Sequence, residues 1–251
     1  MKVVVTAVNI PGPVAAARLR DLGATVTKVE PPDGDPLAAA APEWHARLVQ
    51  GMRVERRDLK ADSLDLADVD VLLTSQRPSS LARLGLGWKE LHARQPRLAQ
   101  VAIVGDGERA GHDLTYIASR GLVDPPHLPR TVTADLLGAE RAVSAALAAR
   151  PGEYIEVSLG QAADTLAEPL RAGLTAPGGL LGGGFAGYGL YEASDGWIAV
   201  AALEPRFRER LAELGRARDE LARAFRERST ADWETWALEH DVPLAAVGSA
   251  G

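Results

Sequence analysis

Val3-Val4-Val5-Thr6-Ala7, followed by Asn9-Ile10-Pro11-Gly12-Pro13, opens the stretch of sequence that decides the fold. The first run is apolar and rich in β-branched residues, as in a buried parallel strand. The second run is typical of a turn that leads into a helix, and Gly23 ends that helix. A second strand is expected over 24–29. Because strand, helix and strand follow one another within about thirty residues, the stretch predicts a right-handed βαβ unit.

The rest of the first two thirds of the chain continues this alternation. Buried strands are expected at 69–74, 98–104 and 153–157, and helices at 134–149 and 158–171, the former capped by Thr131 or Thr133. Alternating strands and helices predict an α/β fold with an open, mostly parallel sheet in Rossmann-like layers. The glycines after the first strand are not spaced G-x-G-x-x-G, so the fingerprint of a dinucleotide-binding site is absent.

A smaller α+β region is expected around a hairpin over 188–201, whose strands flank Ser194-Asp195-Gly196. The glycine-rich segment 173–189 precedes it. This segment is long for a loop in a compact domain, so it is either a lid or disordered. The sequence therefore predicts two domains, a large α/β domain over 1–172 and a small α+β domain over 173–251 that carries the glycine-rich lid loop and C-terminal helices.

The composition excludes several classes of protein. The net charge of −6 argues against nucleic acid as a partner. The chain has no cysteine, which rules out disulfides, thiolate metal sites and cysteine nucleophiles. No apolar run is long enough to cross a bilayer, and the first residues do not have the pattern of a signal peptide. We therefore expect a cytoplasmic protein without a membrane partner.

Three residues are candidates for chemistry. His112 stands in Gly111-His112-Asp113, a glycine turn that continues as a helix with apolar residues at helical spacing. Asp135 falls in the first turn of the helix over 134–149, and Glu204 precedes Pro205 at another helix start. Capping and the helix dipole explain each of them as structural residues. A group that transfers protons, or a nucleophile, is the alternative for each.

Cations gather near the ends of predicted strands. Such positions line the ligand crevice of an open α/β sheet, and guanidinium groups suit a phosphorylated ligand. A solvated charged edge is the competing interpretation. The residues are Arg53, Arg57, Lys60, Arg77 and Arg83.

Taken in order, these features resemble the family III CoA-transferases, a superfamily that includes the α-methylacyl-CoA racemases. The resemblance covers most of the chain and is carried by short motifs. They are Asn9-Ile10-Pro11-Gly12-Pro13, Lys28-Val29-Glu30-Pro31-Pro32-Asp33-Gly34-Asp35-Pro36, Asp58-Leu59-Lys60, Arg83-Leu84-Gly85-Leu86-Gly87, Gly111-His112-Asp113-Leu114, Ala134-Asp135 and Glu204-Pro205-Arg206-Phe207.

His112 and Glu204-Pro205-Arg206-Phe207 are similar to the racemase branch, which implies a racemase or epimerase of 2-methylacyl-CoA thioesters. Inversion removes the α-proton and returns it on the opposite face, through an enolate, so it needs two groups of tuned pKa. The resemblance assigns these roles to His112 and Asp135. Glu204 would orient the imidazole, as a carboxylate does in hydrolase triads.

Two other activities stay open. Transferases of the family have a nucleophilic aspartate at the position of Asp135, which implies CoA transfer between carboxylic acids through an acyl anhydride. A relative that binds an acyl thioester without turning it over is the third reading.

The resemblance also implies the ligand and the assembly. Lys60 and Arg83 match positions that line the CoA site, Arg77 lies nearby, and Arg53, Asp58 and Leu59 belong to the same motifs. Asp106 and Glu108 place two acids where an anionic ligand would pass. No metal or separate cofactor is expected, because coenzyme A is part of the substrate; a thioester on a carrier protein is the alternative. We expect a homodimer, although the chain ends before a segment that family members carry.

Overall fold

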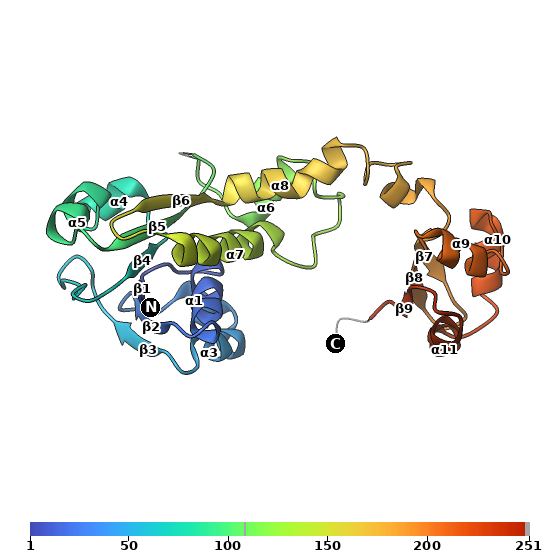
Figure 1. Cartoon of the computed structure of the whole chain (residues 1–251), viewed down its shortest axis with the longest axis horizontal. Coiled ribbons are helices and arrows are strands. Elements are labelled where there is room, and N and C mark those ends of the chain that lie inside the picture. Colours follow the sequence, from blue (N-terminus) through green and yellow to red (C-terminus); the bar gives the residue numbers. More distant parts are fainter. Residues whose placement is uncertain (108, 249–251) are drawn as a thin grey trace. The chain divides into compact units, whose positions relative to one another are not determined.

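The N-terminal part of the chain is built on a six-stranded, wholly parallel sheet. The computed structural model describes residues 1–107 and 109–248. The strand order is β3-β2-β1-β4-β5-β6, so the order reverses between β1 and β4 (Figure 1). The strands are β1 (Lys2–Val5), β2 (Thr25–Glu30), β3 (Arg53–Arg56), β4 (Val71–Thr74), β5 (Ala99–Val104) and β6 (Tyr154–Ser158).

Helices cover the sheet. Four of them, α1 to α4, begin with proline, whose fixed φ suits the first helical position and whose missing N–H costs nothing there. The helices are α1 (Pro11–Asp21), α2 (Pro36–Ala40), α3 (Pro42–Val49), α4 (Pro78–Arg83), α5 (Trp88–Arg94), α6 (Asp113–Ala118), α7 (Thr133–Ala148) and α8 (Leu159–Arg171).

Alternate residues of the central strands enter two separate cores. Val3 and Val5 belong to the core beneath α1 and α7, whereas Val4 belongs to the core that includes Leu81 of α4 and Leu91 of α5. This is the period of two that a strand imposes when helices cover both faces of its sheet.

The first core contains a seam of small side chains where α1 packs against α7. Ala15 and Ala16 of α1 and Ala139 and Ala142 of α7 are all fully buried in it. Small residues let two helices approach closely, so the position of α7 is set by α1 and by the sheet below.

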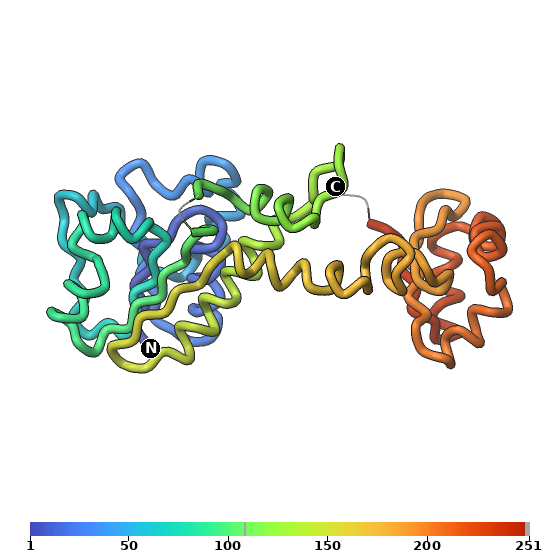
Figure 2. The backbone as a smooth tube through the Cα atoms, turned by 90° about the horizontal axis from the view of Figure 1, so that it is seen from above, coloured from blue at the N-terminus to red at the C-terminus, as the bar shows by residue number. Residues whose placement is uncertain are grey.

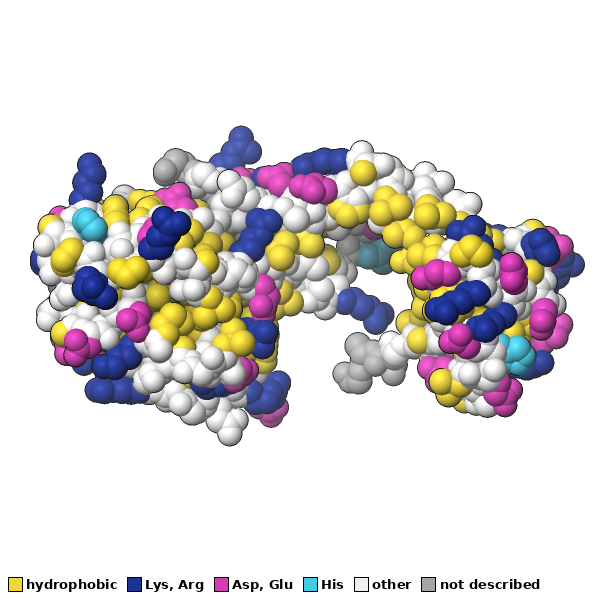
Figure 3. Space-filling model, viewed as in Figure 1, with side chains coloured by type: hydrophobic (Ala, Val, Ile, Leu, Met, Phe, Trp, Pro, Cys, Tyr) yellow, Lys and Arg dark blue, Asp and Glu magenta, His cyan; other side chains and the backbone are white. Residues whose placement is uncertain are grey.

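The C-terminal part has its own core. An antiparallel sheet of β7 (Tyr188–Glu192), β8 (Trp197–Ala201) and β9 (Leu244–Ala246) packs with α9 (Pro205–Leu211), α10 (Arg218–Phe225) and α11 (Thr230–His240). Trp233 and Phe225 are fully buried there, in edge-to-face contact. Over the face shown in Figure 3, charged side chains of both signs are interspersed with apolar ones.

The predicted fold class is confirmed: a parallel α/β sheet is followed by a small α+β region with the hairpin over 188–201. The chain divides into two compact units, Met1–Ala167 and Glu168–Gly251, and the division falls inside α8 (Figure 2). The predicted boundary after residue 172 lies at the end of that same helix. Among the described residues, no helix is both long and apolar enough to span a membrane.

Some local predictions are wrong. The helix over 134–149 begins where expected, but it follows Val132 and has no side-chain cap, so the threonine cap is wrong. The segment 173–189 is not disordered: it forms a series of tight turns closed by backbone hydrogen bonds, with Gly183 at a φ of 93°. The short helices α3 and α5 were not expected, because each spans only two turns and offers too few residues to display a period.

Candidate active site

A cavity of about 230 Å³ lies within the N-terminal unit, at the carboxyl ends of its central strands. Residues 8, 9 and 11 after β1, residues 75–79 after β4 and residues 103–105 at the end of β5 form most of its wall. The cavity therefore sits where the strand order reverses, which is the usual ligand position in an open α/β sheet. His112, just before α6, Tyr116 of α6 and Asp135 of α7 also line the cavity.

His112 is the residue that precedes α6. Its backbone is extended (φ −137°, ψ 172°), and its N–H donates to Thr115 Oγ1 at 3.1 Å while that hydroxyl donates to the His112 carbonyl at 2.8 Å. Thr115 thus closes the helix start, which leaves the exposed imidazole at the cavity. No capping role for the His112 ring is needed to explain the local fold.

Asp135 is buried in the first turn of α7 and is only 7% exposed. Its N–H donates to Asp113 Oδ1 at 2.9 Å, so Asp113 fixes the backbone at the point where the chain enters α7. Burial raises the pKa of Asp135 to about 6, and the charge of Asp113 adds to the rise while His112 opposes it. Asp135 and His112 therefore act on each other electrostatically within one cavity.

Arg77 and Arg109 add positive charge to the lining. Arg77 was predicted as a contact to CoA; Arg109 was not, and no spacing rule marks it. The acid expected to repel an anion here, Asp106, forms an ion pair with Arg120 at 2.6 Å, and Arg120 also binds Asp164 at 3.0 Å. Glu108, the second such acid, lies outside the described residues.

The other predicted CoA contacts do not line this cavity as the described residues form it. Arg53 pairs with Glu55 at 2.6 Å on the edge strand β3. Asp58, Leu59 and Lys60 form a turn in which the Lys60 N–H donates to Asp58 Oδ1 at 3.0 Å. Arg83, at the end of α4, donates to Ser80 Oγ at 3.2 Å. A role for these residues in CoA binding stays a proposal.

Glu204 belongs to the C-terminal unit, whereas His112 and Asp135 belong to the N-terminal one. It is exposed, precedes α9 with an extended backbone, and makes no side-chain cap. The structure thus brings two members of the predicted trio to one cavity, and the pairing of Glu204 with His112 stays a prediction.

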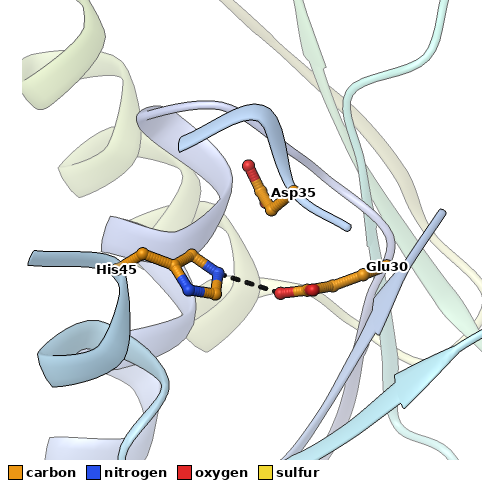
Figure 4. Close-up of side chains that lie close together, drawn as sticks. All are labelled: Glu30, Asp35 and His45. Atoms are coloured by element: carbon orange, nitrogen blue, oxygen red, sulfur yellow. Dashed lines mark hydrogen bonds and ion pairs between the residues drawn. The ribbon is translucent and has the colours of Figure 1, made fainter. Parts of the chain in front are cut away.

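A second group of ionisable side chains comes from the Lys28–Pro36 motif and α3. His45 Nε2 lies 2.9 Å from Glu30 Oε1, and Asp35 lies beside this pair (Figure 4). These three side chains are buried, and one oxygen or nitrogen of each lies within 4.8 Å of the others, which is the residue set of a metal site. Lys28, however, places its fully buried ammonium 3.0 Å from Asp35 Oδ2. The Lys28 ammonium thus already supplies a positive charge beside these carboxylates, and we interpret the group as a structural ion network.

This network connects directly to the cavity. Asp35 Oδ1 accepts the N–H of Leu37, which starts α2, and the N–H of Asn9, each at 3.0 Å. Asn9 lines the cavity and has a positive φ of 64°, a conformation that non-glycine residues seldom adopt unless the surroundings hold it. Asp35 therefore fixes the turn that follows β1.

Comparison with known proteins agrees with this architecture. A succinyl-CoA–D-citramalate CoA-transferase of Chloroflexus aurantiacus is 36% identical over 115 residues, which cover 39% of this chain and 28% of the relative. A cinnamoyl-CoA:phenyllactate CoA-transferase of Clostridium sporogenes is 33% identical over 144 residues, which cover 48% and 35%. The matched region thus spans about a third of the length of these curated relatives.

The fold is shared more widely than the sequence. The crystal structure of the Rv3272 protein of Mycobacterium tuberculosis superposes with a TM-score of 0.84 at 21% identity, covering 100% of this chain and 85% of that one. At that identity the match shows the fold alone. The profile of the CoA-transferase family III matches residues 1–218. The chain therefore belongs to the CoA-transferase family III.

Proposed function

We propose that the chain takes part in CoA transfer between carboxylic acids, with Asp135 as the nucleophile. The observation that carries this proposal is the placement of Asp135: it is buried, it lines the cavity, and its carboxylate accepts no hydrogen bond from any other described residue. A carboxylate with few partners, held at a fixed backbone position, is available to a substrate.

The chemistry can be written as four displacements. An Asp135 oxygen attacks the thioester carbonyl carbon, the C–S bond then breaks, and CoA leaves as a thiolate while the acyl group and Asp135 form a mixed anhydride. The thiolate then attacks the Asp135 carbonyl carbon, which releases the first acid and leaves an Asp135–CoA thioester. A carboxylate oxygen of the second acid attacks the Asp135 carbonyl carbon and displaces the thiolate, so that a second anhydride forms, and the thiolate then attacks the new acyl carbon and breaks its bond to the bridging oxygen. These last two steps release Asp135 and the new acyl-CoA, and no separate cofactor is consumed.

The lining suits these steps. The cavity joins a buried carboxylate to two guanidinium groups, Arg77 and Arg109, which can bind a carboxylate or phosphate. The low exposure of Asp135 limits the access of water, which would hydrolyse an anhydride. The names of the two curated relatives point the same way, since both are CoA-transferases acting on an acyl-CoA and a hydroxy acid. A homodimer remains part of the proposal.

The racemase reading expected from the sequence is less well supported, because those relatives are transferases. The vicinity of His112 and Asp135 in one cavity still favours it as the second candidate, since two proton-transferring groups are what it requires. Its signature would be exchange of the α-proton of a 2-methylacyl-CoA for deuterium, without CoA transfer.

Oxygen-18 decides between them. The chain is incubated with succinyl-CoA or cinnamoyl-CoA and an acid labelled in its carboxylate, and peptides containing residue 135 are weighed. Transfer through Asp135 places one labelled oxygen in that side chain, because the acid oxygen becomes the bridging oxygen of the second anhydride. Asp113→Asn, which keeps an acceptor for the Asp135 N–H, is the folded control that retains the nucleophile. New acyl-CoA without label in Asp135 would refute the nucleophile; deuterium exchange alone would favour the racemase.

A further inference from the structure

Tyr116 occupies an unusual position among the residues of the cavity. It lies on α6, one turn after His112, and is 5% exposed, yet it belongs to the same lining as His112 and Asp135. A buried ring beside the proposed nucleophile is placed to act on whatever Asp135 attacks.

Two glycines make room for the ring. A Cβ atom at Gly105 would lie 2.8 Å from the Tyr116 hydroxyl oxygen, and one at Gly111 would lie 2.6 Å from ring atom Cε1. Both distances are too short for real side chains, so alanine at either position would displace the tyrosine. The hydroxyl is consequently held against the end of β5, at the carboxyl edge of the sheet.

Among the residues that the structure describes, the Tyr116 hydroxyl has no hydrogen-bond partner. Over residues 1–107 and 109–248, no hydrogen bond to the Tyr116 oxygen is found, whereas Tyr154 donates to Glu156 at 2.7 Å and Tyr191 donates to the Ala186 carbonyl at 2.5 Å. The Tyr116 ring is buried, but its hydroxyl is not among the fully buried unpartnered atoms and lies at the cavity, where it is free to bond to a ligand.

The hydroxyl is also kept in its donor form. Burial raises the pKa of Tyr116, and the negative charges of Asp135 and Asp106 raise it further, against a smaller opposite effect of Arg77. At neutral pH the group is therefore a phenol that can donate a proton to an oxygen, and a developing oxyanion is the partner that it would bind best.

We infer that Tyr116 is a further catalytic residue: its hydroxyl donates a hydrogen bond to the carbonyl oxygen of the acyl group that Asp135 attacks. This inference rests on the proposed function. As the Asp135 oxygen bonds to the carbonyl carbon, the π electron pair moves to the carbonyl oxygen, where the Tyr116 hydrogen bond stabilises it. When the pair returns, the C–S bond breaks and the thiolate leaves; Tyr116 keeps its proton throughout.

The test compares Tyr116→Phe with Tyr154→Phe. The same hydroxyl is deleted in both, but the hydroxyl of Tyr154 already has a protein partner and Tyr154 does not line the cavity. A single oxyanion donor contributes about 10²–10³ in kcat. We expect Tyr116→Phe to lower kcat by about that factor with KM changed by no more than a few-fold, and Tyr154→Phe to leave kcat unchanged.

A second measurement does not depend on the phenylalanine variant folding. A fluorotyrosine at position 116 keeps the ring and lowers the pKa of its hydroxyl, so the alkaline loss of kcat should move to lower pH. The same replacement at position 154 should not move it. A structural role for Tyr116 would leave both profiles alike.

The outcomes separate the two proposals. If the unaltered chain forms no labelled Asp135, the transferase proposal fails whatever Tyr116 does. If the unaltered chain transfers CoA while Tyr116→Phe keeps full kcat, or if the fluorotyrosine leaves the pH profile in place, the role of Tyr116 is refuted and the transferase proposal stands.

Discussion

Replacing Asp135 by asparagine should stabilise the protein, and the gain should depend on pH. Burial raises the pKa of this carboxyl group from 3.8 to about 6 in the folded chain. The sign follows from linkage: a group whose pKa is raised by folding stabilises the fold when protonated, and this stability is lost as pH rises through the folded pKa. Above about pH 6 the ionised carboxylate therefore destabilises the N-terminal unit.

The magnitude follows from the two pKa values. One pKa unit corresponds to about 1.4 kcal/mol, so full ionisation of Asp135 costs about 3 kcal/mol. Ionisation of Asp135 lowers the free energy of unfolding by about 1 kcal/mol at about pH 4.5 and by nearly the full amount of about 3 kcal/mol at about pH 7.5. The difference in the free energy of unfolding between Asp135→Asn and the unaltered chain should thus grow by about 2 kcal/mol over that interval. Any cost of burying the amide itself does not vary with pH.

Urea unfolding measures this difference. Because the chain has two compact units, the transition should be read from pulsed hydrogen–deuterium exchange of peptides from α7, so that the N-terminal unit is scored by itself. Asp21→Asn, at an exposed position of the same unit, is the control and should show no comparable rise. If the difference in the free energy of unfolding between the two chains does not change across this pH range, then folding does not raise the pKa of Asp135.

Two further outcomes are expected. Because His112 lowers the pKa of Asp135, the substitution His112→Gln should raise that pKa. The pH at which the stabilisation by Asp135→Asn reaches half of its full value should then shift upward. A downward shift in the same urea titration would contradict the proximity of the two side chains. Asp35→Asn should lower the free energy of unfolding by about 3–5 kcal/mol, since it leaves the ammonium of Lys28 buried without its counter-charge. Asp219→Asn, which breaks an exposed pair, should cost less than about 1 kcal/mol, and equal costs in the two variants would refute the buried network.

The fold class could be predicted because a parallel sheet covered on both faces needs strands that are apolar throughout. Val3-Val4-Val5 and Val71-Leu72-Leu73 have that character, and the structure buries all six residues. The Lys28–Asp35 network could not be predicted in the same way. Lys28 lies in β2 and Asp35 caps α2 beyond the following turn, and a lysine inside the core becomes acceptable only once the tertiary fold brings a carboxylate to it.

The candidate site was predictable in part. His112 and Asp135 were marked by a motif, and the fold places both at one cavity. The sequence does not single out Tyr116, because whether its hydroxyl has a partner depends on the tertiary structure. One histidine could not decide between racemase and transferase. The same pair of groups can either transfer protons or supply a nucleophile with a histidine beside it.

The alanine seam between α1 and α7 links the thermal stability of the fold to the position of the proposed nucleophile. Asp135 continues, one helical turn earlier, the stripe of α7 that contains Ala139 and Ala142. Filling the seam with larger side chains is the usual way to make a core more heat-resistant, but here any added methylene would push the helix that carries the proposed nucleophile. Displacements of about 1 Å at a reacting atom can cost about a hundredfold in rate. Attempts to make the protein more heat-resistant should therefore leave these alanines unchanged and alter the C-terminal unit or the surface instead.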